Sequence, residues 1–338
     1  MTPFLLDRTT ARAAIALANR APSLHNAQPW RWRVGRASVH LFADPSRALP
    51  ATDPDGRDLL VGCGAALHHL RVALRAAGLS SRVHRFPDRA HPGHLAAVEL
   101  SPADPRAEDL VLAGAIERRR SDRRVFSTWP VPAGLAADLV RAAAGEGASL
   151  GVLGAVARRE VLRLVEEAAV EQALTPGLAQ EVAAWTGRSR GAVEGVPAAN
   201  VPVPAGSAGP AAAVPVRHFA AGRLPESELG RDESDGTVLA VLTTPGDGRD
   251  DRLRAGEALS AVLLTATAIG LATDPVTQPL EVPGTRARLT ALLAGSAAAG
   301  APQVLLRTGW APISADPVPA TGRRPVDETI DALDAAWS

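Results

Sequence analysis

The side chains best suited to ligand binding gather in residues 21–30, which read Ala-Pro-Ser-Leu-His-Asn-Ala-Gln-Pro-Trp. Pro22 and Pro29 fix the backbone φ angle and remove two N–H donors, so no regular helix or strand ladder can run through this stretch. It contains four polar side chains that between them donate and accept hydrogen bonds: Ser23, His25, Asn26 and Gln28. Such a stiff loop suits a flat ring rich in nitrogen and oxygen. The alternative is a polar turn before a strand.

A second group of residues could bind an anion. Residues 117–124 read Glu-Arg-Arg-Arg-Ser-Asp-Arg-Arg and follow a predicted helix. Guanidinium groups match phosphate oxygens with paired hydrogen bonds, and Ser121 adds a hydroxyl donor. Arg323 and Arg324 form another basic cluster near the C-terminus. Together the clusters could neutralise a dianion, and the alternative for residues 117–124 is a solvated basic surface.

These segments resemble signatures of the nitroreductase superfamily. Pro-Ser-x-x-Asn-x-Gln-Pro-Trp at 22–30 resembles its flavin-ring loop, and Arg-Arg-Ser-x-Arg at 119–123 resembles the strip that binds the phosphate and ribityl chain of FMN. Gly-Trp-x-Pro at 309–312, followed by Thr-Gly-Arg-Arg-Pro at 321–325, resembles the closing segment whose basic residue returns to the phosphate. Arg323 matches that basic residue best, and Arg324 is second.

The resemblance implies a set of FMN-binding positions. In the superfamily the Ser and Asn of the loop contact the polar ring edge and the ribityl chain, while Gln28 and Trp30 would act as supports here. Thr277 and Gln278 follow Gly270-Leu271, where nitroreductases pass backbone near flavin N5. The expected cofactor-binding residues are Pro22, Ser23, Leu24, His25, Asn26, Gln28, Arg119, Arg120, Ser121, Arg123, Thr277, Gln278, Arg323 and Arg324.

The order of the signatures predicts a fused pseudo-dimer. Nitroreductases are homodimers in which each flavin site takes the strip from one subunit and the loop from the other. In this chain the loop lies in a first half, residues 1–115, and the strip opens a second half, residues 116–338. Partner copies are missing at 142–153 and 4–10, so one complete site is expected. This arrangement resembles the Acg family of nitroreductase-like proteins and implies a monomer, with a homodimer as the alternative.

Two similar helices are expected to position these segments. One follows Asp53-Pro54, a cap followed by a first-turn proline, and runs to Gly78-Leu79. The other runs from about Asp251 to Gly270-Leu271. Gly64 and Gly256 each lie fourteen residues before the terminal glycine. Because a glycine within a helix costs about 1 kcal/mol relative to alanine, we expect close helix–helix packing there, with left-handed caps at the terminal glycines. The repeat favours an internal duplication over a chance similarity of two alanine-rich helices.

The remaining pattern mixes helices and strands without βαβ regularity, which predicts an α+β fold. With the resemblance, this becomes a three-layer α/β/α arrangement. Helices are expected at 9–20, 108–119, 135–143, 159–173 and 178–185. Strands are expected at 30–34, 39–43, 82–86, 95–100, 237–243 and 303–308. Residues 195–216 are rich in Ala, Pro, Val and Gly and should be irregular, either as a lid or as a linker.

Composition excludes several classes of function. The chain has no lysine and no tyrosine, which removes Schiff-base, pyridoxal-phosphate and P-loop chemistry as well as tyrosine acids. The net charge is +0, which argues against a nucleic-acid partner. The single cysteine, Cys63, excludes an intramolecular disulfide and is expected to be buried. His91 and His94 flank Pro-Gly without a clear third ligand, so we expect no metal site.

Nothing in the sequence predicts export or membrane insertion. The longest apolar run, residues 258–272, is interrupted by Ser and Thr and is shorter than the roughly 20 residues that a bilayer needs. The first residues show no signal-peptide pattern. We therefore expect a cytoplasmic protein without a membrane partner.

Three functions remain open at this stage. The leading hypothesis is an FMN oxidoreductase that takes a hydride from NADH or NADPH and reduces a flat small-molecule acceptor such as a nitroaromatic or a quinone. The alternative is a non-enzymatic FMN-binding or sequestering protein with residues 195–216 as a lid over the flavin. The third is a structural relic of the family that binds no flavin and mediates interactions. No catalytic residue is assigned, since solvent could supply the proton, although His25 could donate one, contact the ring or make only a structural hydrogen bond.

Overall fold

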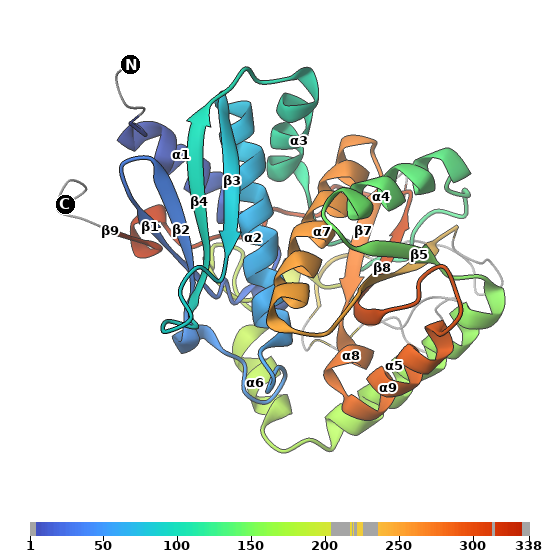
Figure 1. Cartoon of the computed structure of the whole chain (residues 1–338). Coiled ribbons are helices and arrows are strands. Elements are labelled where there is room, and N and C mark those ends of the chain that lie inside the picture. The colour runs from blue at the N-terminus through green and yellow to red at the C-terminus, as the bar shows by residue number, and fades with distance from the viewer. Residues whose placement is uncertain are drawn as a thin grey trace.

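The computed structural model of the chain describes residues 5–203, 217, 219, 222–225, 236–312 and 315–332. Two long helices, α2 (Arg57–Ala76) and α7 (Arg249–Ala268), pack side by side at its centre (Figure 1). A Cβ atom on Gly64 would lie 1.9 Å from the carbonyl oxygen of Leu253, and one on Gly256 would lie 2.0 Å from that of Val61. The predicted close packing at these two glycines is confirmed.

The two central helices end as predicted, but α2 does not begin as predicted. Gly78 and Gly270 have φ angles of +80° and +86°, which confirms the predicted left-handed caps. The prediction that α2 begins directly after Asp53-Pro54 is wrong, because the helix begins at Arg57 with Gly56 as its N-cap. The carboxylate of Asp53 nevertheless accepts a hydrogen bond from the backbone N–H of Leu59 at 2.8 Å. It therefore satisfies a first-turn N–H from outside the helix.

The first sheet has five strands in the order β3-β4-β2-β1-β9. Four of them are antiparallel neighbours: β1 (Trp30–Val34), β2 (Ser38–Ala43), β3 (Leu79–Arg85) and β4 (His94–Pro102). β9 (Ile330–Ala332) comes from the other end of the chain and pairs in parallel with β1. The predicted hairpin of β1 and β2 is confirmed, with Trp30 opposite Ala43.

One face of the first sheet packs against α1 (Arg8–Ala18) and α2. Trp30 and Trp32 of β1 are fully buried on this face. Both indole N–H groups donate to the side-chain oxygen of Asn19, at 2.9 and 3.0 Å, and the Asn19 amide donates to the hydroxyl of Thr329. Asn19 thus fixes the strand that directly follows residues 21–30.

The second sheet is antiparallel and has the order β5-β6-β8-β7. Its strands are β5 (Ser149–Val152), β6 (Val238–Thr244), β7 (Ala272–Val276) and β8 (Ala301–Gly309). α4 (Ala133–Gly145) and α7 cover one face, where Ala240 and Leu242 are buried. α5 (Ala155–Ala173) and α9 (Pro283–Leu293) cover the other face, where Leu239 and Val241 are buried. The sheet therefore lies between two helical layers.

The structure confirms the α+β class and most of the predicted elements. α3 (Ala107–Arg118) packs against both central helices, while α6 (Leu178–Trp185) and α8 (Gln278–Glu281) lie near the end of α2 that begins at Arg57 (Figure 1). β5, β7, β9, α8 and α9 were not predicted. β9 lies in the predicted second half yet extends the sheet of the first, so the second half contributes one strand to the first sheet. Within the described residues, no helix combines the length and hydropathy that a membrane span needs.

Candidate functional site

The loop of residues 21–30 has a strained backbone. Ser23 precedes a short 3₁₀ helix (Leu24–Asn26), and its hydroxyl accepts a hydrogen bond from the N–H of Gln28 at 2.9 Å. His25, Asn26 and Gln28 have φ angles of 49°, 55° and 53°, a region that costs L-residues roughly 1 kcal/mol or more. Gly62 of α2 lies beneath the loop, because a Cβ there would be 3.2 Å from that of Ser23. The sequence stiffens the loop, and α2 gives it a close-fitting support.

Asn26 and Gln28 tie the loop to distant segments. The Gln28 amide is fully buried, donates to the carbonyl of Val193 at 2.8 Å and accepts from the N–H of Arg324 at 2.9 Å. The Asn26 amide donates to the carbonyls of Gly195 and Gly322. Its side-chain oxygen is buried and has no hydrogen-bond partner among the described residues. Gln28 is thus a support, as expected, whereas Asn26 keeps one acceptor free for a ligand.

Two adjoining cavities meet at this loop. The first, called here the large cavity, has about 790 Å³ of space including its mouth, and the second, called the arginine cavity, has about 660 Å³. The large cavity is lined by Pro22, Ser23, Leu24, His25, Asp58, Val61, Gly62, Ser121, Arg123, Arg217, Phe219, Leu259, Asp274, Pro275, Val276, Thr277 and Gln278. The arginine cavity is lined by Arg20, Pro22, Ser23, His25, Asn26, Ile116, Arg119, Arg120, Ser121, Arg123, Val196, Asn200, Thr321 and Arg323. The shared residues make the two cavities one continuous site.

Uncompensated positive charge dominates the arginine cavity. Its described lining holds five arginines and no carboxylate. Burial, followed by repulsion from Arg120, Arg20 and Arg123, lowers the pKa of Arg119 to about 10. Burial and the neighbouring arginines likewise lower the pKa of Arg323 to about 9. Both stay protonated at neutral pH, so the shifts report the cost of gathering these cations.

Several donors in the arginine cavity also lack partners. Arg119 is 6% exposed, and its Nε and Nη1 atoms have no hydrogen-bond partner among the described residues. The Nε atoms of Arg20, Arg120 and Arg323 also have no hydrogen-bond partner among the described residues. Buried donors are almost always hydrogen-bonded, so this cluster points to a bound anion with several oxygens. A phosphate dianion fits both the charge and the donors.

The predicted strip lies along the edge strand of the second sheet. Ser121 forms a parallel bridge with Thr273 of β7, and the N–H of Asp122 donates to the Thr273 carbonyl at 2.9 Å. This pairing places Arg123 between the cavities rather than only at the anion end. Its guanidinium lies 5.2 Å from the ring centre of Phe219 and reaches the carbonyl of Asn200 at 3.5 Å. Arg123 can therefore serve either end of a long ligand.

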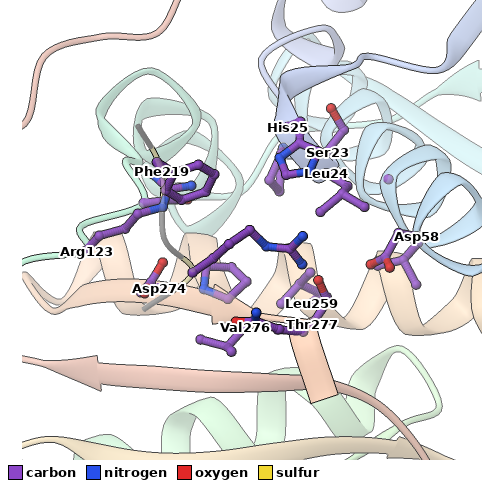
Figure 2. Close-up of a pocket in the computed structure, with 17 residues that line it drawn as sticks. Ser23, Leu24, His25, Asp58, Arg123, Phe219, Leu259, Asp274, Val276 and Thr277 are labelled. Carbon is purple, nitrogen blue, oxygen red and sulfur yellow. The ribbon is translucent and has the colours of Figure 1, made fainter. Parts of the chain in front are cut away.

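Residues from four elements face one another across the large cavity (Figure 2). His25 and Leu24 lie opposite Asp274, Val276 and Thr277, with Asp58 to one side. Burial and the positive charges of Arg217 and Arg123 lower the pKa of His25 to about 3, so the imidazole is neutral. Its ring meets that of Phe219 edge-on, with centroids 6.1 Å apart. The neutral state of His25 and its packing against Phe219 favour a contact with the ring of a ligand over proton donation.

Two expected ligand contacts line neither cavity. The side chain of Gln28 is fully used in supporting the loop, and Arg324 donates to the carbonyl of Glu328 at 2.8 Å and lies 3.6 Å from Asp44 in an ion pair. The other expected positions all line one of the cavities. Arg323 rather than Arg324 thus reaches the anion end.

Several cavity residues were missed by sequence reasoning: Arg20, Asp58, Val61, Leu259, Asn200, Arg217, Phe219 and Asp274. Arg20 could have been found, because it directly precedes the loop and adds to the basic clusters. Val61 and Leu259 have the pattern of core residues in a helix, and nothing local marks them as cavity-lining. Arg217 and Phe219 follow the low-complexity segment and carry no motif.

The segment expected at 195–216 is described only in part, since residues 204–216 lie outside the described ranges. The expectation of a wholly irregular chain is wrong for Ala198–Asn200, which form a 3₁₀ turn. Asn200 donates to the carbonyl of Pro319 at 2.6 Å, and Val196 and Val201 pack with Phe219. The beginning of the segment is therefore docked against the site.

The described residues include no group of three or more His, Cys, Asp or Glu side chains that could hold a metal ion. Cys63 is buried, donates to the carbonyl of Pro29 and has a raised pKa because of that burial. It acts as a packing residue beneath the loop.

A cavity with apolar and charged walls, joined to a cluster of arginines with unpartnered nitrogens, is suited to a flat ligand with a phosphate tail. Comparisons with known proteins agree. The Mycobacterium tuberculosis protein Rv3131, named as an NAD(P)H nitroreductase, is 45% identical over 325 residues, covering 96% of this chain and 92% of its own length. The acg protein of the same organism, also named as an NAD(P)H nitroreductase, is 38% identical over 334 residues, covering 98% of each chain. No family model matches the chain.

The chain belongs to the nitroreductase-like family that includes acg. The resemblance inferred from the loop and the strip is thereby confirmed. Among solved structures, the FMN-dependent nitroreductase NfnB of Mycobacterium smegmatis, in complex with NADPH, matches at a TM-score of 0.36 with 19% identity, covering 64% of this chain and 93% of that one. A nitroreductase structure from Anabaena variabilis matches at 0.40 with 11% identity, covering 88% and 73%.

Proposed function

We propose that the protein is an FMN-binding oxidoreductase that uses NADH or NADPH to reduce a flat acceptor such as a nitroaromatic or a quinone. The observation that carries this proposal is the arginine cavity, with its unpartnered donors, opening into a cavity large enough for a ring system. Family membership supports the same reading, because its named relatives are NAD(P)H nitroreductases. We propose a cytoplasmic monomer.

The residues present fit FMN. Arg119, Arg120 and Arg323, joined by Arg20, would bind the phosphate, and the free oxygen of Asn26 would accept from a ribityl hydroxyl. The ring would lie in the large cavity beside Thr277. When bound, FMN accepts a hydride from a reduced nicotinamide and passes electrons to an acceptor.

The walls of the large cavity have two tasks. Leu24, Val61, Leu259 and Val276 are apolar and limit the access of water. Arg123 and Arg217 bring positive charge to the same cavity, which would stabilise negative charge on a reduced ring. Arg217 is itself held by an ion pair with Glu281. The protein thereby positions charge in advance without an acid or base of its own in the hydride step.

The two central helices differ at positions that an internal duplication would match. Counted from Gly64 and Gly256, Ala65 and Glu257 occupy matching positions in the two central helices. Glu257 is fully buried and is paired with Arg71 at 3.0 Å and with Arg85 at 2.7 Å. The loop and the strip form one pair, at the continuous site made by the two cavities.

We therefore expect one FMN per chain. Purified protein should be yellow, and titration of the apoprotein with FMN, followed by flavin fluorescence, should saturate at a ratio of one. Anaerobic NADH or NADPH should then bleach the flavin absorbance. A ratio of two would contradict the fused-site reading, and a chain that binds no FMN would overturn the proposed function.

The alternative, FMN sequestration, is favoured by one contact. Phe219 packs between His25 and Arg123 at the wall of the large cavity, where it could keep acceptors from the ring. If it acts as a cap, Phe219→Ala should raise turnover with a quinone about tenfold and increase iodide quenching of flavin fluorescence. Trp129→Ala, at an exposed aromatic, is the control. Unchanged turnover and quenching would show that Phe219 is not a barrier, and lower turnover would make it part of the acceptor wall.

A further inference from the structure

Asp58, in the first turn of α2, stands between two spaces. It lines the large cavity, and it also lines a smaller side cavity of about 210 Å³ that contains Asp53 (Figure 2 shows Asp58 at the edge of the large cavity). Asp58 is only 8% exposed. No described residue donates a hydrogen bond to its carboxyl group or pairs with it as an ion. A buried, unpartnered acid that faces a ligand cavity needs an explanation.

The charged groups around Asp58 are occupied elsewhere. Asp53 accepts the N–H of Leu59 at the start of α2. Glu281 of α8 is paired with Arg217 and accepts from Thr277 at 2.7 Å and Gln172 at 2.6 Å. Arg57 donates to Asp247 at 2.5 Å. Asp53, Glu281 and Arg57 thus each have a partner, and Arg217 keeps one buried nitrogen, Nη1, without a hydrogen-bond partner among the described residues.

These surroundings favour the protonated form of Asp58. Burial, then the charges of Asp53 and Glu281, raise the pKa of Asp58 well above its ordinary value, whereas Arg217 and Arg57 oppose the shift. Burial also raises the pKa of Asp53 to about 6, although the N–H groups of α2 counteract it. A neutral Asp58 can donate a proton, which a carboxylate cannot.

We propose that Asp58 donates a proton to the acceptor bound in the large cavity and regains it from water through Asp53 in the side cavity. This inference rests on the proposed function and adds an acid to it. The position of Asp58 between the two cavities gives the proton a separate entry from that of the acceptor.

The transfer balances for a quinone acceptor. Reduction to a hydroquinone requires two electrons and two protons, and a hydride that originates from the nicotinamide supplies both electrons and one proton. The O–H bond of Asp58 then breaks as an O–H bond forms on the reduced quinone, which leaves Asp58 as a carboxylate. Water in the side cavity returns the proton through Asp53. Overall, one reduced nicotinamide, one proton and one quinone give oxidised nicotinamide and hydroquinone.

The test compares acceptors that do and do not need a proton. In the FMN-loaded protein, Asp58→Asn should slow reoxidation of the bleached flavin by a quinone about a hundredfold, within the range for general acids. Reoxidation by ferricyanide, which takes an electron and no proton, should change less than threefold. Asp58→Glu should restore part of the quinone rate. The matched control is Asp55→Asn, since Asp55 is exposed on the same approach to α2.

A second measurement does not depend on turnover. Infrared spectra of the apoprotein at pH 7 should show the carbonyl stretch of protonated carboxylic acids, and the difference spectrum between the wild type and Asp58→Asn should contain one such band. Loss of the quinone and ferricyanide rates together, or a carboxylate signal for Asp58 at pH 7, would overturn the inference alone. A wild-type flavin that NADH and NADPH fail to bleach would overturn the proposed function, and the inference would fall with it.

Discussion

Replacing Arg119 or Arg323 with alanine should weaken FMN binding by about ten- to hundredfold while changing riboflavin binding less than threefold. Each substitution removes a charge-assisted contact to the phosphate worth roughly 1.5–3 kcal/mol, and riboflavin has no phosphate. Arg119 is the sharper case, because its Nε and Nη1 atoms have no partner among the described residues. Fluorescence titration of the apoprotein with both ligands measures the two affinities.

Arg119→Ala should also make the apoprotein more stable. Burial and neighbouring arginines lower the pKa values of Arg119 and Arg323, so the charged forms that prevail at neutral pH cost free energy in the folded state. Removing one cation relieves that cost. The melting temperature of apo Arg119→Ala should therefore rise, while the rise that FMN adds to it should shrink.

Arg324→Ala is the matched control, since Arg324 adjoins Arg323 in sequence but contacts Asp44 and Glu328 rather than the cavity. It should leave the ratio of FMN to riboflavin affinity unchanged. Arg323 also donates to the carbonyls of Thr321 and Arg20, so a purely structural role would weaken both ligands equally. That outcome would contradict the assignment of these arginines to the phosphate.

The parts of the site that the sequence predicted are those with local causes. Two prolines around Ser23 and Asn26 stiffen one loop whatever the rest of the chain does, and the cost of the matching glycines in the middle of two helices indicates that another backbone comes close there. The arginine run could be read in the same way, because so many cations rarely gather without an anion. The structure brings these segments together as expected.

The parts that were missed depend on contacts between segments far apart in sequence. Asp58 looks like an ordinary first-turn acid, and its placement between two cavities requires Asp53, Glu281 and Arg217 to converge on it. β9 is a short strand whose pairing with β1 crosses nearly the whole chain. Neither has a periodic pattern. The tertiary fold, rather than local preference, decides both.

Asp53 shows how a correct local signal can mislead. The pair Asp53-Pro54 has the residue types of a helix start, and the sequence therefore predicts a cap followed directly by the first turn. The structure places Gly56, in the left-handed region at φ 62°, as the true N-cap. Asp53 still serves the helix from a distance through the N–H of Leu59. The residue type of Asp53 thus indicated correctly that its side chain accepts a hydrogen bond from the start of α2. The turn between Asp53 and Arg57 could not be inferred from the sequence.

The largest effect on stability is expected at the crossing of the two central helices. Gly64→Ala and Gly256→Ala should each lower the free energy of unfolding by about 3 kcal/mol, because the new Cβ would meet a backbone carbonyl that cannot move alone. The helices would have to separate along their length. Gly114→Ala is the control, since this glycine lies within α3 with open space around it. It should stabilise the protein by about 0.5–1 kcal/mol. Urea denaturation of the three variants measures all these values.

Separation of these helices should also reach the ligand. Asp58, Val61 and Gly62 of α2 line the large cavity together with Leu259 of α7, so we expect the helix crossing to influence its width. Variants at Gly64 that still fold at low temperature should therefore bind riboflavin more weakly, whereas the preference for FMN over riboflavin should persist because the arginines lie elsewhere. A destabilised Gly64 variant with unchanged riboflavin affinity would show that the cavity is shaped independently of the crossing. A Gly64 variant that loses both stability and riboflavin affinity would show that the packing at the helix crossing determines the width of the ligand site.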